Sequence, residues 1–348
     1  MTPDYSMMEP ALAFLAAYGP DLQNGLTSHA PMAVEALAAL GRAEAVMPWL
    51  ETYRKGLLPA PPRRERIPRD GWRAPLGRED RFADWTALLA DELEEAPWPA
   101  VLARWTARLA PGICASATHG VIRTAHAARS LGEAETPARR RELACGLAYW
   151  AAAYQTLPGA GGPGTLAPAE AIACVGVVPP AERTFDGTIT GSLAALDRFP
   201  PFAAAIGLVD VSGDPAHVVS ALTETFARVS LANTHDLLSA ITFVHGVTSA
   251  TALRSLLPHL PDAVARDALR YAWQAGAALY AAFATAPPAP ADVEPPRESL
   301  ETLVDMAIAN GDEHAIKMTE ACVREHALAP SPVYLAAARR ALDCLAAA

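Results

Sequence analysis

Alanine- and leucine-rich segments with apolar residues at helical spacing run through almost the whole chain, and this pattern constrains the fold more than any other feature. Proline and glycine separate these segments, and several segments begin with Ser, Asp or Pro, as helices often do. Alternating runs of Val, Ile and Thr, which would indicate strands, are scarce. We therefore predict an all-α fold of roughly a dozen helices.

Three loops rich in Pro or Gly interrupt the helical pattern, at residues 59–80, 157–168 and 285–296. Each has the composition of a linker or a lid. The sequence has no repeat of fixed period, so a regular helical solenoid is unsupported. The histidines described below come from both ends of the chain and are expected to meet. We therefore predict a single all-helical domain over residues 1–348, built around a buried histidine-rich pocket.

Composition narrows the range of partners. The chain is 51% apolar and 19% charged and has a net charge of -10, which argues against a nucleic-acid partner. The acidic N-terminus has no basic n-region or long apolar core of a secretory signal, so we expect a cytoplasmic protein. The uncharged stretch that begins at Tyr271 contains Gln274 and runs into prolines, which favours a buried helix over a membrane span. The sequence carries no signal for an oligomeric state.

Histidine is the most informative residue type. Five of the nine histidines lie among apolar or small residues: His29, His119, His126, His245 and His314. His119 and His126 are seven residues apart, so they share one helix face with Arg123. A charged face of this kind suits a polar cavity. The alternative is that each histidine is a structural core residue whose ring nitrogens have hydrogen-bond partners.

Lysine is the rarest basic residue. Only Lys55 and Lys317 are lysines among 28 basic residues, so a lysine is expected where its amine is needed for chemistry that arginine cannot perform. His314 and Lys317 are three residues apart and share a helix face, as two ligands or as a ligand and its supporting partner would. His245 follows the apolar run AITFV and precedes the small-residue stretch GVTSAT, so we expect it to be buried.

Four segments together resemble the questin oxidase-like family: NGLTSHAPMAVEALAALG, HGVIRTAHAAR, ITFVHGVTS and GDEHAIKMTEAC. The likeness extends from about residue 20 to about residue 325. Fungal members of that family include oxidases of anthraquinone and aflatoxin-type polyketide pathways. The resemblance implies an all-helical fold, a histidine-rich non-haem iron centre, and oxidative ring opening of an aromatic polyketide by Baeyer–Villiger-type or dioxygenase chemistry.

The resemblance also implies a ligand set. The matching positions are His29, His119, His245, His314 and Lys317, and we expect these residues to bind Fe(II). Arg123 and His126 are the expected catalytic residues, with Arg123 orienting a phenolate or stabilising developing negative charge. The family pattern has a histidine where this chain has Arg123, and further histidine where it has Met32 and Ala33. His126 is the residue expected to compensate.

Four neutral imidazoles would leave the metal with its full positive charge, which an apolar interior disfavours. We therefore predict that Lys317 is N-carboxylated and supplies an anionic oxygen ligand. The alternative is an ordinary lysine paired with Glu313 or Glu320. The GAGGPG stretch does not follow a strand or open a helix, so it is no dinucleotide-binding motif, and NADPH is compatible only as an external reductant.

The predicted function is an O2-dependent oxygenase acting on a small aromatic or polycyclic substrate. Two other functions use the same residues differently. A zinc- or manganese-dependent hydrolase would employ the histidines without oxygen. A helical binding or scaffold protein would keep them as structural residues.

Overall fold

A computed structural model of the chain describes residues 2–345. It is built almost entirely from helices, which confirms the predicted all-α class. The described chain divides into two compact units. The first comprises residues 2–155 together with Pro258–Pro261, and the second comprises residues 156–257 and 262–345. Each unit is described by itself, and a single domain over residues 1–348 stays a prediction.

The first unit holds seven α-helices and a small hairpin. In chain order these elements are α1 (Met8–Leu15), β1 (Tyr18–Leu22), α2 (Ala30–Ala39), α3 (Ala43–Tyr53), β2 (Leu57–Pro59), α4 (Phe82–Glu95), α5 (Trp98–Leu109), α6 (His119–Glu133) and α7 (Pro137–Ala152). Strands β1 and β2 pair antiparallel, with Tyr18 opposite Pro59 and Leu22 opposite Leu57, so β1 carries two extra residues. The sequence-based analysis did not predict this irregular hairpin.

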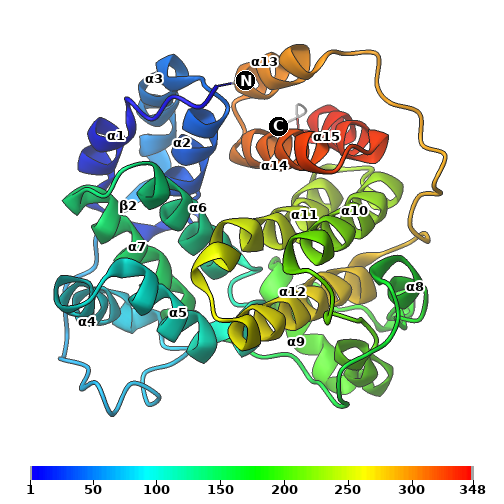
Figure 1. The fold of residues 1–348 in the computed structure, drawn as a ribbon, viewed down its shortest axis with the longest axis horizontal. Helices are drawn as coiled ribbons and strands as arrows, with labels where there is room; N and C mark the ends of the chain where they lie inside the picture. The colour runs from blue at the N-terminus through cyan, green and yellow to red at the C-terminus, as the bar shows by residue number, and fades with distance from the viewer. Residues whose placement is uncertain (1, 346–348) are drawn as a thin grey trace. The chain divides into compact units, whose positions relative to one another are not determined.

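Helices α6 and α7 of the first unit pack directly against each other (Figure 1). Glycines make the close approach possible. A Cβ atom on Gly120 would lie 2.6 Å from Trp150 Cα, and one on Gly146 would lie 3.0 Å from Thr124 Cα. Separations this short are within steric overlap, so only glycine lets the two backbones meet here. The pairing fixes the first turn of α6, which begins at His119.

The helix that carries His119 begins at His119, although the helical sequence pattern extends back to Ser116. The segment from Ser116 has helical composition, yet Ser116, Ala117 and Thr118 have φ angles of 46°, 53° and 74°. The left-handed region disfavours residues with a Cβ atom, by about 1–2 kcal/mol each. Three in succession are an unusual concentration of backbone strain, and such strain tends to gather at functional sites.

A short piece from late in the chain completes the first unit. Pro258–Pro261 belongs to it by contact, and the ring of His259 packs edge-on against Trp98 of α5 at a centroid distance of 4.5 Å. The first unit is therefore built from two separate stretches of chain.

The second unit contains eight α-helices. They are α8 (Pro168–Ala173), α9 (Ile189–Ala194), α10 (Pro215–Asn233), α11 (Leu237–Leu256), α12 (Asp262–Phe283), α13 (Leu300–Asn310), α14 (Glu313–Leu328) and α15 (Pro332–Leu345). Helix α11 lies against α10, α12, α14 and α15, so nearly every residue on its last four turns is buried. Short 3-10 segments in the two units lie at Arg54–Gly56, Glu79–Arg81, Ala110–Gly112, Pro180–Glu182, Ala195–Arg198, Pro200–Gly207 and Leu257–His259.

The helix starts of the second unit follow capping rules. Asp214, Asp236, Ser299 and Asp312 each accept a hydrogen bond from a backbone N–H of the first turn that follows. Across residues 2–345, no helix combines the length and the apolar character needed to cross a bilayer. The stretch from Tyr271 begins in α12, whose C-terminal half is buried as predicted, and continues into the loop after Phe283.

Candidate metal centre

Two buried histidines meet between α11 and α14 of the second unit. His245 lies in the middle of α11, which continues through the small-residue stretch that follows it, and His314 lies in the first turn of α14. The two ring centroids are 5.4 Å apart with the rings edge to face, and each ring offers a nitrogen within 4.8 Å of one on the other. Both side chains are buried. The arrangement places two imidazoles where one ion can contact both.

The Nδ1 atom of each ring faces an oxygen. His245 Nδ1 lies 2.6 Å from the carbonyl oxygen of Ile241, and His314 Nδ1 lies 3.0 Å from Asp312 Oδ1. Because both oxygens are acceptors, each Nδ1 carries the proton and Nε2 carries the lone pair. In histidines that bind metals, the ring nitrogen that does not contact the metal almost always donates a hydrogen bond to an oxygen, as it does here. The donor set therefore fits a divalent metal that favours imidazole, such as iron or zinc.

Asp312 shapes this site through two contacts. Its Oδ1 also accepts a 2.7 Å hydrogen bond from the backbone N–H of His314, which caps α14. Burial alone would raise the pKa of Asp312, but the hydrogen bonds that it accepts from the ring and the backbone of His314 lower the pKa below its ordinary value. The carboxylates of Asp312 and Glu313 and the His314 ring also bring ligand atoms within 4.8 Å of one another. Asp312 is thus an ionised partner of the histidine.

Lys317 lies one turn after His314 on the same face of α14. It is 1% exposed and is among the largest fully buried side chains of the chain. Burial lowers the pKa of Lys317 to about 8, while the charges of Glu313 and Asp312 act in the opposite direction. A substantial share of the amine is therefore neutral near pH 8, and a neutral amine is the nucleophilic form.

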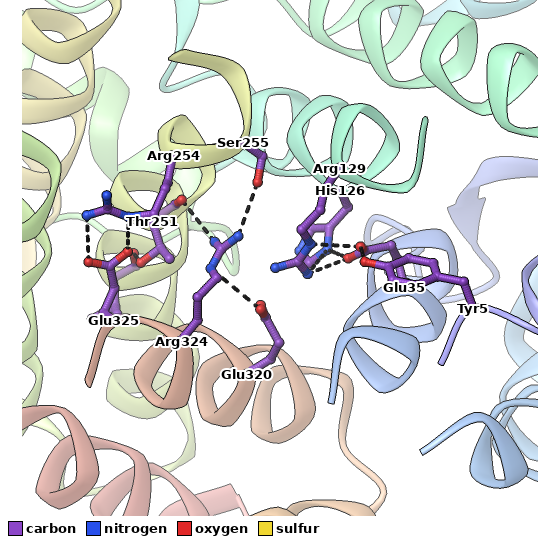
Figure 2. A network of polar contacts seen from close by, with 11 residues as sticks. Tyr5, Glu35, His126, Arg129, Thr251, Arg254, Ser255, Glu320, Arg324 and Glu325 are labelled. Atoms are coloured by element: carbon purple, nitrogen blue, oxygen red, sulfur yellow. Dashed lines mark hydrogen bonds and ion pairs between the residues drawn. The ribbon is translucent and has the colours of Figure 1, made fainter. Parts of the chain in front are cut away.

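Ion pairs hold α11 against α14. Arg254 of α11 makes two hydrogen bonds to the fully buried carboxylate of Glu325 in α14, at 2.5 and 2.9 Å. Arg324 of α14 donates to the Ser255 hydroxyl and the Thr251 carbonyl of α11, at 3.1 and 3.0 Å. These contacts can be followed in Figure 2. They fix the relative position of the helices that carry His245 and His314.

The first unit holds a second pair of histidines. His29 immediately precedes α2 and His119 opens α6, and their ring centroids lie 4.4 Å apart. His119 Nδ1 bonds the carbonyl oxygen of Ser116, so its Nε2 also carries the lone pair. That carbonyl belongs to the left-handed segment described above. The strained turn therefore orients the His119 ring.

A triangle of three hydroxyl groups ties together the segments that carry this pair. The Tyr149 hydroxyl lies 2.6 Å from Thr27 Oγ1 and 2.8 Å from Ser116 Oγ, and these two oxygens are 3.1 Å apart. Thr27 is two residues before His29, and Ser116 is three residues before His119. Burial raises the pKa of Tyr149 to about 12, so its hydroxyl stays protonated and can donate. Tyr149 is thus a positioning residue for both histidines.

Arg123 and His126, the predicted catalytic residues, are each held by a carboxylate of the first unit. Arg123 makes two hydrogen bonds to Glu142, at 2.6 and 3.0 Å. His126 Nδ1 lies 2.5 Å from Glu35 Oε2, and Arg129 donates to both oxygens of the same carboxylate (Figure 2). Burial would raise the pKa of Glu35, but the Arg129 charge and the hydrogen bonds hold it well below its usual range. Both predicted residues thus take part in ion pairs, and their catalytic roles stay predictions.

Within the first unit the structure brings His29 and His119 together. Within the second unit it brings His245 and His314 together, with Lys317 one helical turn after His314. It also shows roles that the sequence did not predict for three residues: Asp312, Tyr149 and Glu35. Asp312 had a local signal, since an Asp before a helix start caps the helix and lies close to His314. Tyr149 and Glu35 had none, because their partners are distant in sequence. The amino-acid sequence matches no protein-family model, and a comparison with curated proteins gives no match either.

Proposed function

We propose that the protein is a metal-dependent enzyme in which His245 and His314 bind a divalent ion through Nε2. One observation carries this proposal. Each buried imidazole has its Nδ1 held by an oxygen, from the Ile241 carbonyl and from the Asp312 carboxylate. A purely structural histidine needs no second imidazole beside it, whereas a metal needs several ligands with fixed tautomers. The flanking Arg254–Glu325 contact keeps the pair preorganised.

We further propose that the ion is Fe(II) and that His29, His119 and Lys317 complete its ligands. This step rests on the four sequence segments that resemble the questin oxidase-like family. The pairing of His29 with His119 inside the first unit supports it, because the Ser116 carbonyl fixes the His119 tautomer as expected for a ligand.

Lys317 would take part as a carbamate. Its neutral amine adds to carbon dioxide, forming an N–C bond and releasing one proton, and the product carries one negative charge. Full burial supports this role, because it costs free energy to hold an unmodified ammonium group in an apolar interior. The cost is larger still if a metal cation lies beside that group. A carbamate oxygen bound to a cation removes both costs.

The reaction that we propose is oxidation of an aromatic or polycyclic substrate by dioxygen. The iron supplies the redox chemistry that singlet organic substrates need in order to react with O2. With one oxygen atom inserted into the ring, the other leaves as water, using two electrons and a proton from external NADPH and one proton from solvent. With both atoms inserted, no reductant is needed. Arg123 and His126 are the proposed residues for orienting the substrate and moving its proton.

Elemental analysis of protein purified without oxygen tests the metal proposal. We expect close to one iron per chain in the unsubstituted protein and its loss in His245→Ala and Lys317→Ala. His217→Ala is the matched control, because the His217 side chain is 92% exposed and should leave the metal content unchanged. No metal in the unsubstituted protein would overturn the proposal and leave the histidines as structural residues.

One further variant and the identity of the metal separate the parts of the proposal. Loss of iron in His29→Ala as well as His245→Ala would support a single centre, whereas retention in His29→Ala would remove the first-unit pair from the ligand set. Zinc or manganese in place of iron, with activity that does not consume oxygen, would replace the oxygenase by a hydrolase.

A further inference from the structure

The first unit contains a cavity of about 610 Å³ lined by α1, α4 and α7. The ion pair of Arg123 and Glu142 forms part of its wall, and none of the nine histidines lines it. Cavities that bind small organic molecules fall in the range of about 300–1,000 Å³. The space is therefore large enough for a ligand of several rings.

The walls of this cavity are mainly apolar. Leu12 and Leu15 come from α1, Phe82 and Leu93 from α4, and Pro61 from the loop after β2. Three small alanines of α4, at 83, 87 and 90, leave the central space open, because a larger side chain at any of them would fill it. The body of a ligand placed here would be buried against hydrocarbon.

Arginines bring an excess of positive charge to the same cavity. Arg63, Arg140 and Arg141 line it, in addition to Arg123, whose charge is balanced by Glu142. The lining offers only Glu94 and Glu142 as carboxylates, and Glu142 is already paired with Arg123. Three arginines therefore face one remaining acid.

These arginines keep unused hydrogen-bond donors. Arg63 lines the cavity and makes no ion pair within residues 2–345. Arg141 donates from Nη2 to the Ala16 carbonyl at 3.2 Å, which leaves most of its donors available. Arg140 donates from Nη2 to the Leu93 carbonyl and forms a long ion pair with Glu135, 3.6 Å from its Nε, which leaves its Nη1 donors available.

We propose that this cavity binds a small amphipathic organic anion, with a flat apolar body against α1 and α4 and one carboxylate or sulfonate group at Arg63, Arg140 and Arg141. Planar guanidinium groups suit a carboxylate because they donate two parallel hydrogen bonds. Binding at this site requires no metal, because the arginines supply the positive charge.

Binding at this site is non-covalent. Cys145 lines the cavity, but burial and the neighbouring charge of Glu142 raise the pKa of its thiol to about 11. The thiol is therefore protonated near neutral pH and is a poor nucleophile. The Arg123 guanidinium stays charged and stays engaged with Glu142.

Titration calorimetry on metal-stripped protein tests the proposal, with 2-naphthoate as the probe and neutral 2-naphthamide as its uncharged counterpart. We expect one naphthoate per chain and binding of the amide at least about tenfold weaker, since hydrogen bonds to charged groups are worth about 1.5–3 kcal/mol. Ala87→Phe fills the cavity and should abolish binding. Ala107→Phe on the exposed face of α5 is its control.

Charge removal gives a second measurement that does not depend on packing. Arg63→Gln combined with Arg141→Gln should weaken naphthoate binding about tenfold or more and leave the amide unaffected. Arg198→Gln, at an exposed position of the second unit, should change neither. Unaltered naphthoate binding in both Ala87→Phe and the double arginine variant, or equal binding of naphthoate and naphthamide, would overturn the proposal.

Discussion

The Asp312 carboxylate accepts two hydrogen bonds from His314, one from its backbone N–H and one from its ring, at 2.7 and 3.0 Å. One oxygen atom thus caps a helix and fixes a tautomer. The two tasks respond differently to substitution, because an amide oxygen serves as a cap almost as well as a carboxylate but is a weaker acceptor for an imidazole.

Asp312→Asn should therefore lower metal affinity by about tenfold or more while the free energy of unfolding changes little. Asp312→Ala should lower the affinity as well and should also cost about 1 kcal/mol of stability through loss of the cap. Metal titration and urea unfolding measure the two effects. Asp214→Asn is the matched control, since Asp214 caps α10 beside an exposed histidine. Equal affinity in the two Asp312 variants and the unsubstituted protein would remove Asp312 from the site.

Gly120→Ala should destabilise the protein by about 2 kcal/mol, because its new Cβ atom would lie 2.6 Å from Trp150 Cα and push α6 away from α7. Gly132→Ala in the same helix has open space around it and should stabilise by about 1 kcal/mol. Chemical unfolding of both variants gives the comparison. If both substitutions changed the free energy of unfolding in the same direction, close packing of α6 on α7 would not be the reason for glycine at position 120.

Glu35→Gln should cost about 3 kcal/mol, because it removes the charge that Arg129 and His126 contact in a buried setting. The pH dependence has a definite sign. The pKa of Glu35 is lower in the folded state than its ordinary 4.5, so its contribution is complete above pH 4.5 and is lost as the pH falls below that value. Between pH 6 and pH 3, the free energy of unfolding should therefore decrease less steeply for Glu35→Gln than for the unsubstituted protein. The exposed Glu44→Gln serves as the control, and an unchanged acid slope in Glu35→Gln would contradict the assignment.

Tyr149→Phe removes one corner of the hydroxyl triangle and should destabilise the first unit by about 1–2 kcal/mol. It should also loosen the segments before His29 and His119, which hydrogen exchange of their backbone amides would report. Tyr280→Phe is the control, since the Tyr280 hydroxyl makes no hydrogen bond within residues 2–345. Exchange rates equal to those of the unsubstituted protein would show that the triangle does not hold these segments.

Local rules account for most of the fold. Helical spacing and capping residues indicate helices where α10 to α15 lie, because their patterns are long and their starts carry Asp, Ser or Pro. The short helices α8 and α9 lie in Pro- and Gly-rich sequence and have too few residues for a period. The β1–β2 hairpin contains Pro20 and unequal strands, so it shows no alternation.

The candidate site was predictable only in part. His314 and Lys317 lie on one helix, so their relation follows from helix geometry alone. The contact of His245 with His314 depends on how α11 packs on α14, which single-sequence patterns do not specify. The left-handed turn at Ser116 could not be predicted from the sequence either. Its residues have no preference for positive φ angles, so tertiary contacts must impose this conformation.

The contact between Trp98 and His259 limits how the chain can be divided. A gene fragment that ends at residue 155 would encode seven helices of the first unit but would lack Pro258–Pro261, which the same unit includes. Such a fragment would expose one face of Trp98 to water. The two units are therefore not modules that can be cloned apart or exchanged by a single crossover, and a rearrangement that preserved both would have to keep the connection from α11 to α12 intact.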